Sequence, residues 1–293
     1  MSSIGVFDSG IGGLTVAALS DKDSGFGGLS ILKALRQVLP QYDYVYLGDS
    51  RRNPYGSRSD ETILDWTREC VDFLMRERGC HLIIVACHTA SNVALRSLQR
   101  DYLPNSPWPE RRILGVTIPL IEAACKIARY RVGILATKAT CRSGGFVVEV
   151  HKRRPELQVF QQAAPLLVGM VEEGLQKSPE CNRLMRRYLN PLKRQAIDTL
   201  ILGCTHFPLL YRNFCAKAGN SIKVLDSGKV VSLSLLDYLK RHPEIEQSLK
   251  QGNTCSYLTT DDPKSFSEQG KMFLGQTFSA SKVLVEGSYC APF

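Results

Sequence analysis

Short apolar runs alternate with longer amphipathic stretches along this chain. Residues 82–85 (Leu-Ile-Ile-Val) and 200–202 (Leu-Ile-Leu) contain no polar side chain, which is typical of strands buried on both faces of a parallel sheet. Residues 61–77 instead place apolar side chains at helical spacing, with Ile63, Leu64, Val71, Leu74 and Met75 as core candidates. Because strands and helices alternate throughout, the pattern predicts an α/β fold with doubly wound parallel sheets.

The same reasoning assigns most of the remaining chain. Further strands are expected at 4–7, 42–48, 113–116, 131–135, at the start of 224–228, and near residue 257. Further helices are expected at 31–39, 93–98, 121–128, about 165–175, 180–195, 230–240 and 263–274. Residues 104–109 are rich in proline and are typical of a linker. We therefore expect a second domain to begin at residue 110.

Composition and charge narrow the class of protein. The chain has 293 residues, 44% of them hydrophobic and 22% charged, which is an ordinary globular composition. It has neither an apolar stretch of the roughly 18 residues that a membrane span needs nor the features of a signal peptide. We expect a cytoplasmic protein with no membrane partner. The net charge of +9 is spread in small groups without a nucleic-acid motif, so nucleic-acid binding is not expected.

The ten cysteines do not form a metal or disulfide pattern. No Cys-x-x-Cys pair occurs, and most cysteines of a cytoplasmic protein are free thiols. Cys204 and His206 are two metal-ligand types, but no second pair nearby completes a tetrahedral set. We expect no metal site.

Two of the cysteines follow buried strands directly. Cys87 comes after the strand at 82–85 and before a predicted helix, where parallel sheets bind ligands and where a helix N-terminus lowers the pKa of a thiol. Cys204 stands in the same position after the strand at 200–202 and is followed by Thr205 and His206. Each cysteine alone is also explained as a buried structural residue. Because both thiols follow a buried strand in the same way, the sequence favours a site between two similar domains.

A glycine-rich turn after the first strand adds an acidic candidate. Asp8 and Ser9 begin the sequence Asp-Ser-Gly-Ile-Gly-Gly-Leu, whose spacing is not that of a dinucleotide site. A second copy begins at Asp23 and Ser24 but follows a poor strand, so we favour Asp8 and Ser9 as the working turn. Asp8 is equally well explained as a helix cap. Lys138, beside threonines, is weak support for a pyridoxal site, and no cofactor is expected.

Several stretches together resemble the glutamate racemases of the cofactor-independent aspartate/glutamate racemase superfamily. They occur in the order found in that family and cover nearly the whole chain: Val6-Phe-Asp-Ser-Gly-Ile-Gly-Gly-Leu-Thr, Asn53-Pro-Tyr-Gly, Val85-Ala-Cys-His-Thr-Ala, Gly133-Ile-Leu-Ala-Thr-Lys-Ala-Thr, Gly174-Leu, Leu202-Gly-Cys-Thr-His-Phe-Pro-Leu-Leu and Val224-Leu-Asp-Ser-Gly. The resemblance implies two similar α/β domains that face each other across a central cleft. Residues 1–109 and 224–293 would form the first domain, and residues 110–223 the second.

The resemblance also implies an activity and a set of residues. Cys87 and Cys204 would flank the Cα of glutamate, one removing a proton and the other delivering one, to interconvert L- and D-glutamate for peptidoglycan. Asp8 would assist Cys87, and His206 would assist Cys204. The residues expected to hold the substrate are Asp8, Ser9, Tyr55, Gly56, His88, Thr89, Thr205 and His206. The family implies no cofactor, and a homodimer is compatible with the chain.

His88 departs from the pattern of the family. The family usually has asparagine directly after the first catalytic cysteine, whereas this chain has an imidazole, which is larger and titrates. Two alternatives therefore stay open from the sequence: a racemase of another small acidic amino acid such as aspartate, or a weakly catalytic binding protein on the same scaffold.

Overall fold

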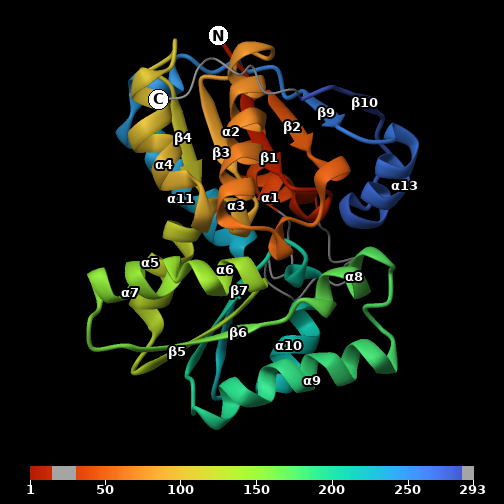
Figure 1. Ribbon diagram of the computed structural model, residues 1–293. Helices are drawn as coiled ribbons and strands as arrows, with labels where there is room; N and C mark the ends of the chain where they lie inside the picture. The colour runs from red at the N-terminus through yellow and green to blue at the C-terminus, as the bar shows by residue number, and fades with distance from the viewer. Residues whose placement is uncertain (15–30, 286–293) are drawn as a thin grey trace.

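The protein is described here from a computed structural model, in which residues 1–14 and 31–285 are described. Its strands form two sheets in which all neighbouring strands are parallel (Figure 1). The six-stranded sheet has the order β10-β9-β2-β1-β3-β4, with β1 Ile4–Asp8, β2 Tyr44–Gly48, β3 Leu82–Val85, β4 Arg112–Gly115, β9 Cys255–Thr259 and β10 Ala280–Lys282. The four-stranded sheet has the order β6-β5-β7-β8, with β5 Arg131–Ala136, β6 Gln158–Ala163, β7 Thr199–Gly203 and β8 Lys223–Leu225. The predicted fold class is confirmed.

Helices connect the strands within each domain. Those of the first domain are α1 Ile31–Val38, α2 Asp60–Arg76, α3 His88–Val93, α4 Leu95–Ser97, α11 Ser227–Arg241, α12 Pro243–Glu246 and α13 Pro263–Leu274. Those of the second are α5 Thr117–Ile127, α6 Lys138–Ser143, α7 Gly145–Arg153, α8 Leu166–Glu172, α9 Pro179–Arg194 and α10 Tyr211–Ala218. Short 3₁₀ turns occupy Gly12–Leu14, Ser50–Arg52, Tyr55–Ser57, Leu103–Asn105 and Phe207–Leu210, and a π-helical turn occupies Leu98–Tyr102.

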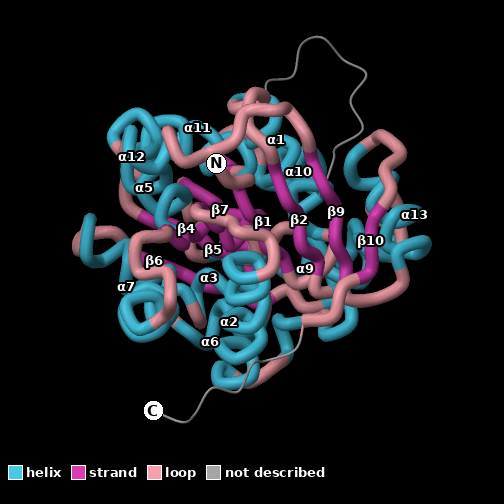
Figure 2. The backbone as a smooth tube through the Cα atoms, turned by 90° about the horizontal axis from the view of Figure 1, so that it is seen from above, coloured by secondary structure: helices cyan, strands magenta, loops and turns pink. Residues whose placement is uncertain are grey.

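The first sheet is buried on both faces, as its apolar strands predicted. One face packs against α1 and α11 and the other against α2 and α3, so that helices flank the strands on both sides (Figure 2). The alternation of side chains explains this arrangement: Ile4 and Val6 of β1 belong to the first cluster, whereas Phe7 belongs to the second. Burial of one such side chain stabilises the fold by about 1.5–3 kcal/mol.

The expected domain boundaries differ from the sheets by one strand at each crossing. β4 follows the proline-rich linker but pairs with β3, with Val85 opposite Gly115, so residues 112–115 remain in the first domain. β8 pairs with β7, so residues 223–225 still belong to the second domain. An edge strand belongs to the domain of the strand with which it pairs, whatever loop precedes it. The position of a linker in the sequence does not reveal that pairing.

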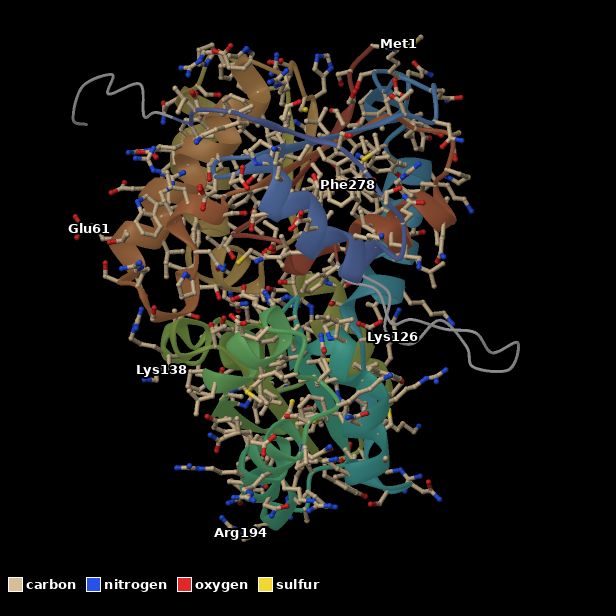
Figure 3. All side chains as sticks on the ribbon, turned by 90° about the vertical axis from the view of Figure 1, so that its right-hand side faces the viewer. Met1, Glu61, Lys126, Lys138, Arg194 and Phe278 are labelled. Atoms are coloured by element: carbon tan, nitrogen blue, oxygen red, sulfur yellow. The ribbon has the colours of Figure 1, made fainter. Side chains whose placement is uncertain are left out.

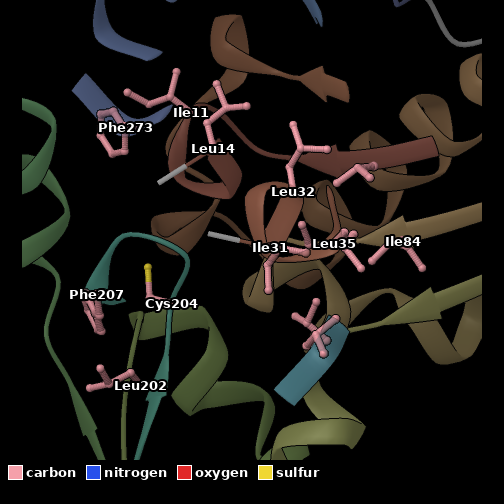
Figure 4. Close-up of a cluster of buried hydrophobic side chains, with 14 of the residues drawn as sticks. Ile11, Leu14, Ile31, Leu32, Leu35, Ile84, Leu202, Cys204, Phe207 and Phe273 are labelled. Carbon is pink, nitrogen blue, oxygen red and sulfur yellow. The ribbon is translucent and has the colours of Figure 1, made fainter. Parts of the chain in front are cut away.

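The topology brings four strand ends together. Asp8, Cys87, Thr137 and Cys204 lie at or just after the carboxyl ends of β1, β3, β5 and β7. Figure 4 shows Cys204 with its sulfur on the side of the first-domain turn that carries Ile11 and Leu14. The loops that carry the candidate site residues of the two domains therefore lie next to each other.

Candidate active site

A cavity of about 230 Å³ lies between the two domains, and residues of both line it. Nine of the ten predicted site residues lie in its wall: Ser9, Tyr55, Gly56, Cys87, His88, Thr89, Cys204, Thr205 and His206. The tenth, Asp8, is fully buried and contacts Thr205 of this wall. The volume is below the roughly 300–1,000 Å³ of drug-sized ligand sites, which favours a small ligand.

Two glycines let the domains approach closely. A Cβ atom on Gly12 would lie 2.4 Å from Thr205 Oγ1, and one on Gly56 would lie 2.7 Å from Thr137 Cβ. Both distances are shorter than any side chain tolerates, so these positions require glycine. Asp8 joins the same contact, because its Oδ1 accepts a hydrogen bond from Thr205 Oγ1 at 3.3 Å. The glycine-rich turn thus serves as the contact surface between the domains.

Cys87 is a buried thiol in an environment that disfavours its charge. Its exposed fraction is 4%, and its Sγ donates to Ser9 Oγ at 3.4 Å. Burial, together with the negative charge of Asp8, raises the pKa of Cys87 to about 12. The backbone N–H of Ala90, in the first turn of α3, lowers the pKa of Cys87 as expected of a helix N-terminus, but burial outweighs this effect.

Cys204 has a different neighbourhood. Its Sγ lies 3.8 Å from His206 Nδ1, and His206 Nε2 lies 3.0 Å from Glu172 Oε1. Burial opposes a charge on His206, but hydrogen bonds to Cys204 and Glu172 outweigh it and raise the pKa of His206 to about 10. His206 is therefore an imidazolium at neutral pH, with Nδ1 directed at the Cys204 sulfur.

Glu172 links this group to the other domain. Its Oε1 also accepts a hydrogen bond from Asn53 Nδ2 of the first domain at 2.9 Å. Burial would raise the pKa of Glu172, but hydrogen bonds from His206 and Asn53 lower it. The carboxylate is consequently charged and ties Asn53, across the cavity, to His206.

Hydroxyl groups gather at the end of β5. Thr137 Oγ1 lies 2.9 Å from Thr89 Oγ1 of the first domain and 2.9 Å from Thr140 Oγ1. Thr137 also caps α6 by accepting from the backbone N–H of Thr140 at 3.2 Å. Thr89 and Thr137 line the cavity, so this hydroxyl cluster can donate to a substrate carboxylate.

The Tyr55 hydroxyl is held by a buried carboxylate, that of Asp49. Asp49 Oδ2 accepts from Tyr55 OH at 2.5 Å and from Arg52 Nε at 2.6 Å, and Asp49 Oδ1 accepts from Thr260 Oγ1 at 2.8 Å. Burial, together with the neighbouring Asp49 carboxylate, raises the pKa of Tyr55 well above its usual value. Tyr55 is therefore a neutral, fixed wall of the cavity.

His88 lines the cavity but has no polar partner in the described part of the chain. The residue is 1% exposed, and neither ring nitrogen has a hydrogen bond there. Burial lowers the pKa of His88 to about 3. The ring is therefore neutral, with one donor and one acceptor unpaired beside the cavity.

Sequence reasoning assigned no role to three polar residues of the cavity wall, Asn53, Thr137 and Glu172. Asn53 and Thr137 lie within matching stretches but were not among the candidates. Glu172 lies two residues before the matching stretch at Gly174. The second copy of the turn, with Asp23 and Ser24, lies outside the described residues, so the choice between the two copies stays a prediction.

The described residues offer little for a metal or a Schiff base. No group of three or more His, Cys, Asp and Glu side chains in residues 1–14 and 31–285 is arranged to hold a metal ion. The nine described cysteines are free thiols. Lys138 lies at the cavity but is an exposed side chain.

Comparison with known proteins gives one consistent result. Residues 29–232 match the family model of the Asp/Glu/hydantoin racemases. The glutamate racemase of Geobacter metallireducens is 35% identical over 275 residues, which cover 93% of each chain. A glutamate racemase isoform of Bacillus anthracis has a TM-score of 0.83 at 29% identity, covering 97% of this chain and 98% of that one. The Francisella tularensis glutamate racemase, solved with D-glutamate, has a TM-score of 0.81 at 30% identity, covering 97% and 98%.

These likenesses extend over nearly the whole length of both chains and agree in fold and in sequence. They confirm the resemblance on which the two-cysteine site was predicted. The chain belongs to the glutamate racemase family, within the Asp/Glu/hydantoin racemases.

Proposed function

We propose that this protein interconverts L- and D-glutamate by proton transfer at Cα between two thiols, and so supplies D-glutamate for peptidoglycan. The observation that carries the proposal is the placement of Cys87 and Cys204, one from each domain, in the wall of a single small cavity. A carbon can be deprotonated on one face and reprotonated on the other only if acid–base groups stand on both sides of it.

The different surroundings of Cys87 and Cys204 suggest how racemisation in one direction begins. The Cys204 thiolate, stabilised by the His206 imidazolium, removes the α-proton, so that a Cα–H bond breaks and an S–H bond forms. Cys87 carries its proton because burial raises its pKa to about 12, and it donates that proton to the opposite face. The opposite enantiomer needs the reverse arrangement, with Asp8 and Ser9 close to the Cys87 sulfur to accept and guide its proton.

The rest of the cavity supports binding of the amino acid. Hydroxyls of Ser9, Thr89, Thr137 and Thr205 and the backbone of Gly56 surround the space between the thiols. These neutral hydroxyls can donate to a carboxylate and accept from an ammonium group, and they add no charge that would pair with the thiolate. His88 and Tyr55 complete the binding wall in this proposal.

Exchange of the α-hydrogen tests the proposal directly. L-glutamate is incubated in D₂O with the protein and no added cofactor, and Cα deuteration and D-glutamate are measured by NMR and chiral chromatography. We expect both to appear, and L-aspartate in parallel to react far more slowly. Absence of exchange in a folded protein would leave a binding role on this scaffold, whereas preference for aspartate would reassign the substrate.

Independence of cofactors is tested by dialysis. Because both proton-transfer groups are supplied by the chain, prolonged dialysis against a chelator should leave the rate unchanged. A loss of activity that pyridoxal phosphate or a divalent metal restores would overturn this part of the proposal.

A further inference from the structure

Basic residues occur along the whole chain, but the net positive charge is confined to one of the two domains. Residues 117–225, from α5 to β8, contain 17 lysines and arginines against 7 aspartates and glutamates, a formal charge of +10. All other residues together contain 20 basic and 21 acidic side chains, a formal charge of −1. The net positive charge of the chain therefore lies entirely in the second domain.

Much of this charge lies on the outer face of α9. The helix buries Cys181, Met185, Tyr188, Leu189 and Leu192. Its exposed basic side chains follow helical spacing on the other side: Arg183, Arg186, Arg187, Lys193 and Arg194. No ion pair joins any of these five to an acidic side chain within the described ranges, whereas the basic residues of α7 are paired with Glu149. Figure 3 places Arg194 at the end of the molecule opposite Met1.

An exposed aromatic residue lies beside the end of this helix. Asp198 accepts hydrogen bonds from the backbone N–H groups of Arg129, Tyr130 and Arg131 at 2.8–3.1 Å, which fixes the loop before β5. Arg131 Nη1 donates to the carbonyl of Gln195, just after α9, at 3.2 Å. Tyr130 is 75% exposed, the highest value for an aromatic side chain in the described part of the chain.

We propose that this surface, the basic pole, docks on a bilayer that contains anionic phospholipids. The basic pole consists of the five basic residues of α9 together with Arg129 and Tyr130. Clusters of four to eight lysines and arginines are attracted to anionic lipid surfaces. Tyrosine prefers the boundary between headgroups and acyl chains, since its ring is apolar and its hydroxyl polar.

The shape of the pole favours a membrane over a nucleic acid. It is built on the exposed side of α9 and on the loop before β5, no cavity described for the molecule includes its residues, and it offers one aromatic ring. Proteins that hold single strands use a groove with several stacking aromatics. The expectation of no membrane partner rested on the lack of a spanning segment, and among the described residues no helix could in fact cross a bilayer. Peripheral docking needs no such helix.

Docking at the pole leaves the cavity accessible. The pole lies at the amino ends of β5 and β7, near Arg131 and Asp198, whereas the cavity lies at their carboxyl ends, near Thr137 and Cys204. The inference is independent of the proposed racemase activity, because no residue of the pole lines the cavity.

Vesicle binding by the full chain tests the inference. Vesicles of phosphatidylcholine with 30–50 mol% phosphatidylglycerol, roughly the anionic content needed for a strong surface potential, are sedimented with the protein at low and high salt. We expect binding that salt weakens, and at most weak binding to pure phosphatidylcholine. Arg186→Glu/Arg187→Glu/Arg194→Glu should lower the partition coefficient by about 100-fold or more. The neutral triple variant with glutamine at the same positions should show a smaller loss.

A matched variant controls for net charge. Lys264→Glu/Lys271→Glu/Lys282→Glu changes the charge equally but on exposed residues of the first domain, and it should bind like the parent. Tyr130→Ala should retain salt-sensitive binding but with a partition coefficient lowered severalfold. Equal binding to neutral vesicles, equal loss in the first-domain variant, or binding to a 20-base-pair duplex without binding to vesicles would each overturn the inference. Circular dichroism and thermal unfolding of every variant report that it is folded.

Discussion

The two cysteine loops look alike in sequence but differ in structure. Each follows a buried strand, and each has a histidine close behind, at Cys87-His88 and Cys204-Thr-His206. In the first loop α3 begins at His88 itself, and its ring has no partner among the described residues. In the second loop the helical turn begins only at Phe207, and His206 Nδ1 lies 3.8 Å from the thiol. The imidazole that is two residues after its cysteine contacts the sulfur, whereas the imidazole that is one residue after its cysteine does not.

The difference has a chemical consequence. Cys204 lies beside an imidazolium that is held by Glu172, whereas Cys87 lies beside Asp8 and is protonated. In the proposed mechanism the two thiols exchange roles, and their different neighbours make the two directions start from different surroundings. Similar motifs at two strand ends therefore do not imply chemically equivalent thiols.

The largest effect is expected from removal of either sulfur. Cys87→Ser and Cys204→Ser should each lower kcat for racemisation by about 10³-fold or more, because a hydroxyl is a far weaker acid–base group at neutral pH. Circular dichroism and thermal unfolding should show an intact fold. Cys125→Ser, at a buried cysteine away from the cavity, is the control and should keep its activity. Full activity in either cavity variant would end the two-thiol mechanism.

Asp8 tests the side that lacks an imidazole. Asp8→Asn should lower kcat by about 10²-fold, the usual scale for a general acid–base group, and should lower the pKa of Cys87, because the negative charge that helps to raise it is removed. Asp23→Asn, in the second copy of the turn, is the matched control and should have little effect. If Asp23→Asn is instead the damaging change, the working turn is the second copy.

Glu172 tests the other side. Glu172→Gln keeps the shape but removes the anion that holds His206, so the pKa of His206 should fall below about 10. Loss of a hydrogen bond between charged groups corresponds to a decrease of about 10- to 100-fold in kcat/KM. The alkaline limb of the pH profile should move to lower pH. Glu173→Gln, at the exposed neighbour, should leave the profile unchanged, and an unshifted profile for Glu172→Gln would contradict the role of the pair.

The same pair predicts how stability depends on pH. The pKa of His206 is raised from 6.5 to about 10 in the fold, so its contribution is complete below pH 6.5 and is lost as pH rises through 10. The pKa of Glu172 is lowered from 4.5, so its contribution is present above pH 4.5 and is lost at lower pH. Urea denaturation should therefore show the parent more stable than Glu172→Gln, with the difference greatest between about pH 4.5 and 6.5 and shrinking as the pH falls below 4.5 or rises toward 10.

The sequence predicted those parts of the molecule that depend on local pattern. The strand before Cys87 is an unbroken apolar run, and α13 has the predicted bounds 263–274. β6 was missed because Gln158–Ala163 mixes polar residues into a half-buried edge strand. Glu172 was missed because the fold brings it from a helix 34 residues before His206. The pKa of Cys87 depends on burial, which no local pattern reports.

The smallest effect concerns His88, where the two loops differ most in appearance. Burial lowers the pKa of its ring to about 3, so the imidazole is neutral across the working range and gains nothing from attraction to a carboxylate. A neutral ring donates through one nitrogen only, whereas the amide usual in the family donates two hydrogens and also accepts. We therefore expect His88→Asn to raise kcat/KM for glutamate by about fivefold, equivalent to one good hydrogen bond of roughly 1 kcal/mol.

Steady-state kinetics in both directions decides the role of His88, with the gain expected in KM more than in kcat because the ring lines the cavity and makes no hydrogen bond to either thiol. His88→Leu is the matched control, because it removes both ring nitrogens from a buried site at similar size. It should stabilise the free protein, since a buried nitrogen without a hydrogen bond costs free energy. It should also weaken substrate binding, since a bound substrate could no longer pair with these nitrogens. If His88→Asn is clearly worse than the parent, the imidazole has become a required contact of this cavity. If both variants behave like the parent, His88 contributes only to the wall, and the difference between the two cysteine loops rests on His206 alone.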